Sequence, residues 1–224
     1  MPINLFDDTI DINKNLDMSE VLNKVDENIN NSISAFSVRE GEEAIFDGCE
    51  SRKFDYVIFQ YNHGIIDELC FEIMKIVDEF MFLTSRQISI ILNLRGQKVK
   101  QHKVQQKLKM LTKGKVLSRY YFESEEGSSL TRMYTLDVHG RRLLKNRGHK
   151  CNTRKGDELK PVYISKRILM RNQILVSFMV KSQNFRNYEI NPSYYNKKHR
   201  RKFKGDALIT LDNGDSEFQF IFFI

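Results

Sequence analysis

The chain has 224 residues, of which 41% are hydrophobic, and 36 Lys and Arg against 29 Asp and Glu give it a formal net charge of +7. Because it has no run of 18 apolar residues, and its amino terminus lacks the basic start and apolar core of a secretory signal, we expect a soluble cytoplasmic protein without membrane contact. Its three cysteines are widely spaced, which argues against a disulfide framework and a structural zinc site.

The charge is distributed unevenly along the chain. Residues 1–50 hold twelve Asp and Glu against three Lys and Arg, a balance of −9, whereas the other 174 residues hold 33 basic and 17 acidic side chains, a balance of +16. The sequence therefore predicts an acidic, partly disordered arm over residues 1–50 and a basic body. The arm is either a solvated segment with one amphipathic helix around Met18–Ile29, or it competes for the basic face or docks a protein partner.

Apolar residues dominate the beginning of the body. Lys53–Tyr61 is aromatic and β-branched, which favours a strand or an extended lead-in. Ile65–Phe82 then predicts a helix with apolar residues on nearly every side. Since one apolar flank suffices to pack a helix on a small domain, this helix is expected either to lie between two layers or to meet a second copy of the chain. A homodimer through Ile65–Phe82 is therefore one of two expectations.

The stretch from Met81 to Phe122 is the most informative part of the sequence. It holds ten Lys and Arg and no Asp or Glu. Positive charges gathered in this way repel one another unless a polyanion meets them, so double-stranded DNA is the expected partner.

The elements of this stretch can be predicted in order. Thr84 supplies a capping hydroxyl for a short helix. Apolar residues at i, i+4 and i+7 predict a second helix over Lys100–Thr112, closed by Gly114 as a left-handed cap. Val116–Phe122 and Arg132–Leu136 are expected to pair as a hairpin. Helix, turn, helix and hairpin is the order of a winged helix-turn-helix.

The second helix of this pair offers polar side chains that could read DNA. If it enters the major groove, Gln105 and Gln106 can each grip adenine through two hydrogen bonds. Basic side chains around them would hold phosphates. The predicted DNA-binding residues are Arg95, Lys98, Lys100, His102, Lys103, Gln105, Gln106, Lys107, Lys109, Lys113, Arg119 and Arg132.

The remainder of the chain predicts a smaller region. A helix is expected over Asp137–Arg147, and the polar segment 149–161 is expected to be a linker. A long apolar helix over Ile164–Val180 and a β-hairpin around Asn213-Gly214 follow. The predicted fold class is α+β, with a winged helix-turn-helix domain over residues 54–148, the linker, and a helix-plus-β-hairpin region over residues 162–224.

Two segments carry a family resemblance. Leu108–Leu117 looks like the end of a winged-helix recognition helix with the first wing strand, and Tyr134–Leu144 is similar to the segment that follows the wing. Both motifs occur in antibiotic-resistance-type repressors and in the replication-relaxation proteins of plasmids and conjugative elements of Gram-positive bacteria. The resemblance to replication-relaxation proteins implies sequence-specific DNA binding in replication, relaxation or mobilisation of such an element. A dimeric transcriptional regulator that binds an operator is the alternative.

The resemblance also bears on catalysis. In replication-relaxation proteins the winged-helix part is followed by a region that resembles a restriction-endonuclease core, where a Pro-Asp pair and a later acidic residue hold Mg²⁺. Here Gly205 precedes Asp206, and only Glu217 offers a second carboxylate nearby. Divalent-metal catalysis needs several converging oxygen ligands, so residues 162–224 are expected to be a truncated, inactive nuclease-like core. We expect no enzymatic activity, no metal and no cofactor.

Overall fold

The computed structural model describes residues 36–48, 53–125, 127–157, 160–196, 200–214 and 216–224. Contacts divide the chain into two units, Met1–Ser37 and Val38–Ile224, and all the helices and strands named below belong to the second. The predictions made for residues 1–35, among them the helix at Met18–Ile29 and most of the acidic arm, lie outside the described residues.

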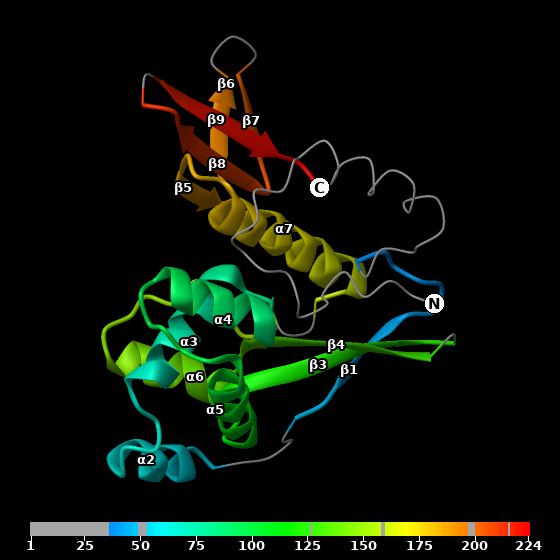
Figure 1. Cartoon of the computed structure of the whole chain (residues 1–224). Coiled ribbons are helices and arrows are strands. Elements are labelled where there is room, and N and C mark those ends of the chain that lie inside the picture. The colour runs from blue at the N-terminus through cyan, green and yellow to red at the C-terminus, as the bar shows by residue number, and fades with distance from the viewer. Residues whose placement is uncertain (1–35, 49–52, 126, 158–159, 197–199, 215) are drawn as a thin grey trace. The chain divides into compact units, whose positions relative to one another are not determined.

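The described residues form helices and antiparallel strands, which confirms the α+β class (Figure 1). The first elements are β1 (Glu43–Phe46), α2 (Phe54–Asn62), α3 (Glu68–Phe80), β2 (Leu83–Thr84), α4 (Ser85–Leu94), α5 (Gln101–Lys113), β3 (Leu117–Ser124), β4 (Gly127–Leu136) and α6 (Val138–Asn146). They are followed by α7 (Val162–Lys181), β5 (Phe185–Ile190), β6 (Ser193–Asn196), β7 (Arg201–Lys204), β8 (Ala207–Asp212) and β9 (Glu217–Phe222). None of the described helices combines the length and the low polarity needed to span a bilayer.

The helix α3 is the centre of the hydrophobic core. Its apolar side chains, from Cys70 and Phe71 to Val77 and Phe80, are at most 1% exposed. They pack against α4, α6 and β4 of the same chain. The apolar composition of Ile65–Phe82 is therefore explained by burial between layers of this chain, the first of the two expectations, and needs no second copy.

The helix α4 begins where the sequence predicts. The Thr84 hydroxyl accepts a hydrogen bond from the Gln87 backbone at 3.2 Å, and the Gln87 side chain accepts one from the Thr84 backbone at 2.9 Å. This reciprocal capping box satisfies two amide groups that the first turn leaves without a helical partner. The i, i+3, i+4 spacing of the buried Ile88, Ile91 and Leu92 then turns the apolar side of α4 into the core.

Two local predictions are wrong. Lys53–Tyr61 is no strand, because Phe54–Asn62 is the helix α2, whose inward side chains recur at the helical spacing of Phe54, Val57, Ile58 and Tyr61. Gly114 is no left-handed cap either, since it has φ −80° and the chain turns left-handed one residue later, at Lys115 with φ 57°.

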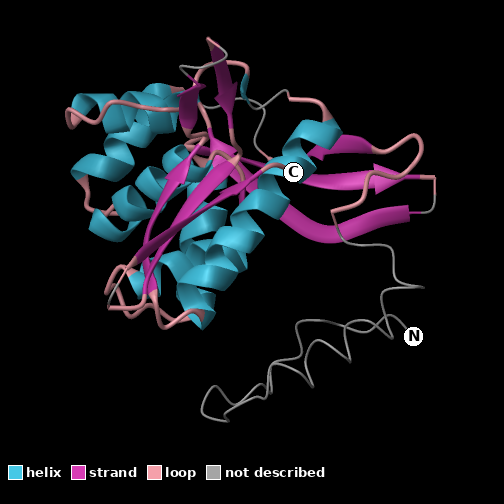
Figure 2. Ribbon diagram, turned by 90° about the horizontal axis from the view of Figure 1, so that it is seen from above, coloured by secondary structure: helices cyan, strands magenta, loops and turns pink. Residues whose placement is uncertain are grey.

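A four-stranded sheet with the order β1-β3-β4-β2 packs beside these helices. The predicted hairpin is confirmed as β3 and β4, which extend past the helices in two perpendicular views (Figures 1 and 2). The short strand β2 pairs with the end of β4, and β1 pairs with the outer edge of β3. Gly140 lets α6 approach this sheet closely, because a Cβ there would lie 2.3 Å from the Val116 carbonyl oxygen.

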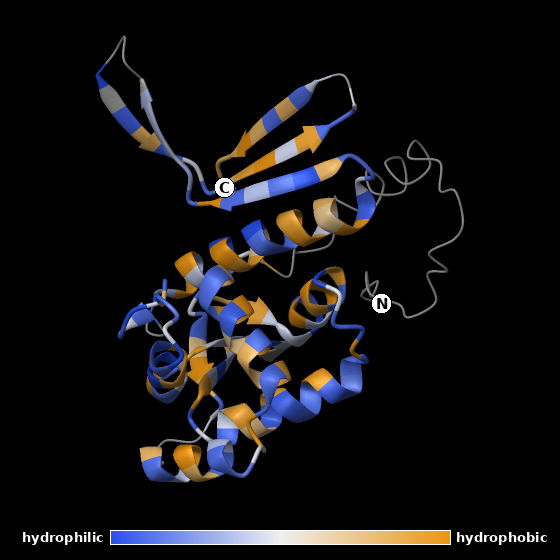
Figure 3. Cartoon of the chain, turned by 90° about the vertical axis from the view of Figure 1, so that its left-hand side faces the viewer, coloured by the Kyte–Doolittle hydropathy of each residue, from blue (hydrophilic) through white to orange (hydrophobic). Residues whose placement is uncertain are grey.

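The long helix α7 joins the two parts of this unit. It contacts α4 and β2 as well as β5 and β8, and hydrophobic and hydrophilic segments alternate along it (Figure 3). Among its buried polar residues, Asn172 donates to the carbonyls of Phe80 and Phe82 at 3.1 and 2.6 Å. The predicted hairpin around Asn213-Gly214 is confirmed as β8 and β9, in a sheet with the order β5-β8-β9.

Candidate nucleic-acid interface

Helix α5 presents two opposite faces. Its buried side chains, Val104, Leu108 and Leu111, are at most 1% exposed and fix the helix against the core. Exposed residues with the spacing i, i+3, i+4, i+7 and i+11 form a single stripe on the other side. This stripe consists of His102, Gln105, Gln106, Lys109 and Lys113.

Three further lysines, Lys98, Lys100 and Lys103, are exposed at the beginning of the helix. The turn that carries the first two is held by Asn93 of α4, which donates to the Val99 carbonyl at 3.0 Å and accepts from the Val99 amide at 2.9 Å. Together with the stripe they are called the α5 surface below. Among the described residues, no side chain of this surface has an acidic partner.

Two predicted DNA-binding residues near α5 are ion-paired within the chain. The Lys107 ammonium lies 2.8 Å from the Asp67 carboxylate. Burial acts to raise the pKa of Asp67, but the hydrogen bonds from Lys107 and Cys70 outweigh it and hold this pKa below its usual range. The Arg95 guanidinium lies 2.6 Å from Glu79 and 3.1 Å from the Tyr188 hydroxyl of β5. Burial and the hydrogen bond to Glu79 raise the pKa of Tyr188 to about 12, so this hydroxyl stays protonated at neutral pH.

The two predicted arginines of the hairpin share one carboxylate. Arg119 of β3 and Arg132 of β4 lie 3.0 and 3.2 Å from the two oxygens of Asp47, which follows β1. The backbone of Asp47 is also tied to β3, because its amide donates to the Arg119 carbonyl at 2.8 Å and its carbonyl accepts from Arg119 Nε at 2.9 Å. Asp47 therefore offsets one of the two positive charges of the hairpin arginines.

The structure thus divides the twelve predicted residues into two groups. Eight of them form the α5 surface, where ammonium groups can bind phosphates and glutamine amides can both donate to and accept from base edges. The other four, Arg95, Lys107, Arg119 and Arg132, hold carboxylates. These pairs could not be predicted from the sequence, since Asp47, Asp67 and Glu79 all lie outside the acid-free stretch.

The carboxylates considered for metal binding lie apart. Asp206 directly precedes β8, whereas Glu217 is paired with Asp212 at the opposite end of that strand. Asp206 receives two hydrogen bonds from Arg167, at 3.2 and 2.7 Å, and one from the Ile224 amide at 2.8 Å. Glu217 instead contacts Arg186. No group of three or more His, Cys, Asp and Glu that could hold a metal ion occurs in the described part of the chain.

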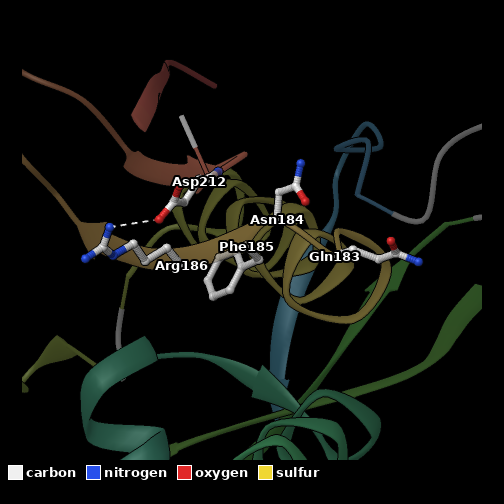
Figure 4. Close-up of a pocket in the computed structure, with 6 residues that line it drawn as sticks. Gln183, Asn184, Phe185, Arg186 and Asp212 are labelled. Atoms are coloured by element: carbon white, nitrogen blue, oxygen red, sulfur yellow. Dashed lines mark hydrogen bonds and ion pairs between the residues drawn. The ribbon is translucent and has the colours of Figure 1, made fainter. Parts of the chain in front are cut away.

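Arg186 also lines a shallow hollow at the start of β5, beside Phe185 and Asn184 (Figure 4). Its guanidinium lies 2.9 Å from Asp212 and contacts Glu217 as well. Two carboxylates therefore compensate the one arginine of this hollow, which distinguishes it from the α5 surface.

Comparison with known proteins assigns the chain to a family. Searches among curated proteins and among solved structures find no significant match. The sequence profile of one family, described as replication-relaxation, matches residues 74–224, which run from the middle of α3 through β9. The match includes α4, α5, the hairpin, α6 and α7 with its sheet. The chain therefore belongs to the replication-relaxation family.

Proposed function

We propose that the chain binds double-stranded DNA through a winged helix-turn-helix, and that this binding serves the replication, relaxation or mobilisation of a plasmid or another mobile element. The observation that carries the proposal is the α5 surface, where five lysines, two glutamines and a histidine are exposed without an acidic partner among the described residues. Family membership supports the link to replication and relaxation.

The order of elements supports a winged helix. Helix α3, the short strand β2, helices α4 and α5 and the hairpin of β3 and β4 follow one another, and β2 pairs with β4. In this arrangement α5 takes the position of the recognition helix, and the hairpin is the wing. The face of α5 that carries Gln105 and Gln106 is then the one that meets the major groove.

The residues of the interface divide into two roles. Gln105 and Gln106 read base edges, since a glutamine amide can bind adenine through two hydrogen bonds. The five lysines of the α5 surface bind phosphates and position the helix. Arg95, Lys107, Arg119 and Arg132 contribute only when a phosphate replaces the carboxylate that each one holds.

The proposal describes a binding protein and not a nuclease. Asp206 and Glu217 lie at opposite ends of a six-residue strand, which at about 3.4 Å per residue separates them by much more than one metal ion can bridge. Arg167 and Arg186 engage the two carboxylates instead.

The assembly state stays a prediction. The apolar side chains of α3 are buried in the chain itself, so a homodimer through Ile65–Phe82 would have to use the exposed Ile65, which is 42% exposed, and the polar rim of the helix. A protein partner for the acidic arm concerns residues 1–50, which lie mostly outside the described residues.

Binding of the full chain to labelled duplex DNA tests the proposal. We expect Lys109→Ala with Lys113→Ala to weaken binding to every duplex by about tenfold or more, because two phosphate contacts are lost. The matched control is Lys75→Ala with Lys181→Ala, which removes the same charge from α3 and α7. Equal effects of the two double variants would refute the assignment of α5.

Selection of bound sequences from a random pool tests the orientation of α5. Gln106→Ala should change which sequences are selected, whereas Lys98→Ala should weaken all of them and leave their ranking intact. An unchanged ranking with Gln106→Ala would mean that this face does not read bases. The selected site also distinguishes a replication or mobilisation factor from a transcriptional regulator. Repeats at an origin support the first, and a promoter palindrome supports the second.

A further inference from the structure

The strands β6 and β7 form a two-stranded ribbon that carries basic and aromatic side chains outside the α5 surface. They pair antiparallel, with Tyr195 opposite Lys202 and Ser193 opposite Lys204. In Figure 3 this ribbon, at the upper left, extends away from the sheet of β5, β8 and β9. It is therefore a small sheet with two faces of its own.

An aromatic pair occupies one face of the ribbon. Tyr194 lies opposite Phe203, and their rings stack with centroids 5.4 Å apart at an interplanar angle of 23°. Cross-strand aromatic pairs of this kind stabilise strand pairing. Because successive side chains of a strand point to opposite faces, Tyr195, Lys202 and Lys204 lie together on the other face.

This other face, called the Tyr195 face below, presents an aromatic ring beside two cations. Tyr195 is 61% exposed, and Lys202 and Lys204 are exposed as well. The Cβ atoms of directly opposite residues lie about 5 Å apart, and those of diagonal neighbours about 7–8 Å. Both ammonium groups are thus within reach of a ligand that covers the ring.

The two lysines of the Tyr195 face have no acidic partner in the described part of the chain. Residues 197–199, which connect the strands and lie outside the described residues, are Lys, Lys and His and so bring no carboxylate. Glu189 of β5 acts on the opposite face, where burial and this carboxylate raise the pKa of Tyr194. The charge of the Tyr195 face therefore favours a polyanion.

The base of the ribbon is held by the rest of the fold. Asn191, which precedes it, has φ 54° and accepts a hydrogen bond from the buried Arg171 of α7 at 3.2 Å. The Pro192 carbonyl accepts from the Gly205 amide at 3.0 Å. A Cβ at Gly205 would lie 2.7 Å from a methyl carbon of Ile221, so only glycine fits this close approach without a shift. The ribbon thus leaves the fold at a fixed point.

We propose that the Tyr195 face binds single-stranded DNA, with the Tyr195 ring stacked on an unpaired base and Lys202 and Lys204 bound to phosphates. An aromatic side chain can stack on any base, and lysines follow the backbone without regard to sequence. A duplex offers phosphates as well, but its bases already stack on one another, so it leaves the ring without a partner. Only the choice of DNA over RNA rests on the proposed function.

The stacking can be measured directly, because the chain contains no tryptophan. Tyr195→Trp introduces a single one, whose fluorescence is quenched when a base stacks on the indole. At low salt and saturating ligand, an oligothymidylate of twelve nucleotides should quench this fluorescence several-fold more than a duplex of the same length. Tyr163→Trp, on α7, is the matched control, since Tyr163 is 60% exposed, and it should show no quenching with either ligand.

The affinity of the full chain for labelled oligothymidylate tests the individual residues. Tyr195→Ala should weaken binding by about tenfold, because one base stack is lost, whereas Tyr195→Phe keeps the ring and should bind like the wild type. Lys202→Ala with Lys204→Ala should flatten the slope of log K against log salt concentration by about 1.4, since each phosphate contact with a single strand contributes about 0.7. The Lys75→Ala, Lys181→Ala control should leave this slope unchanged.

The outcomes distinguish this inference from the proposed function. If oligothymidylate does not quench the Tyr195→Trp variant, or quenches Tyr163→Trp equally, the single-strand site is refuted, while duplex binding through α5 stands. If it quenches Tyr195→Trp alone and no duplex binds the chain, the ribbon site stands and the proposed function fails. Equal quenching of Tyr195→Trp by the duplex would refute the preference for an unpaired base, and tighter binding of oligouridylate would refute DNA as the ligand.

Discussion

Asn172 shows how a single buried amide can hold a chain reversal. Met81, which ends α3, has φ 72°, in the left-handed region that is unfavourable for a residue with a side chain. The carbonyls on either side of it, those of Phe80 and Phe82, both accept from Asn172. Arg171 donates to the Phe80 carbonyl as well, at 3.0 Å. The turn that leads from α3 to β2 and α4 thus depends on α7, a helix some ninety residues later in the chain.

Replacement of this amide should therefore destabilise the fold. Asn172 is fully buried. Asn172→Ala would remove the donor to the Phe82 carbonyl and the oxygen that accepts from the buried Arg171 guanidinium, so we expect the free energy of unfolding to fall by about 2–4 kcal/mol. Denaturation in urea measures this. Lys181→Ala, an exposed change in the same helix, serves as control and should have little effect. A loss below about 0.5 kcal/mol for Asn172→Ala would contradict the role assigned to it.

Asp206 should make stability depend on pH. Burial acts to raise the pKa of Asp206, but the hydrogen bonds from Arg167 and from the Ile224 amide hold it below the ordinary value of 3.8. A carboxylate whose pKa is lower in the folded state contributes stability that is complete above the unfolded pKa and is lost as the pH falls through the folded pKa.

The variant Asp206→Asn should accordingly be less stable than the wild type at neutral pH, because it cannot pair with Arg167. The gap in the free energy of unfolding should narrow when the pH falls below about 3.8. Urea denaturation of both proteins at several pH values measures the gap. A gap of the same size at neutral and at acidic pH would show that the ion pair does not stabilise the fold.

At the scale of elements, the sequence predicted the features that depend on residues close together in the chain. The Thr84 cap, the buried stripe of α5 and the long helix α7 depend on residues within one or two turns of each other, and the β3–β4 hairpin joins two strands that follow one another in the chain. Helix α2 was missed because aromatic and β-branched residues hid the spacing of Phe54, Val57, Ile58 and Tyr61. The pairing of β1 with β3 and the position of Asp47 could not be predicted, since they join residues more than seventy positions apart.

The ion pairs of Asp47 with the two hairpin arginines lead to a prediction about the proposed wing. If Arg119 and Arg132 contact DNA, Asp47 competes with phosphate for both of them. Asp47→Asn should then tighten duplex binding by a few fold at low salt, because it removes the competing charge while the backbone contacts to Arg119 remain. Glu72→Gln, which frees Lys75 on α3 and changes the net charge equally, is the matched control. Equal effects of both variants would show that the hairpin arginines do not contact DNA.

At the scale of the whole molecule, the basic side chains differ in whether a carboxylate of the chain binds them. Several basic side chains of the body, among them Lys107 and Arg167, are occupied by carboxylates. On the α5 surface, by contrast, basic side chains gather without an acidic partner among the described residues. The sequence predicted this place from its acid-free stretch.

The salt dependence of duplex binding tests the central claim most directly. Each phosphate contact releases counterions and adds about −0.9 to the slope of log K against log salt concentration. Five lysines on the α5 surface predict a slope of about −4 or steeper for the full chain. The Lys109→Ala, Lys113→Ala variant should flatten that slope by about 2, and the Lys75→Ala, Lys181→Ala control should leave it unchanged. If the full chain does not bind duplex DNA at low salt, or if the α5 variant does not alter the slope, DNA binding through the α5 surface is contradicted.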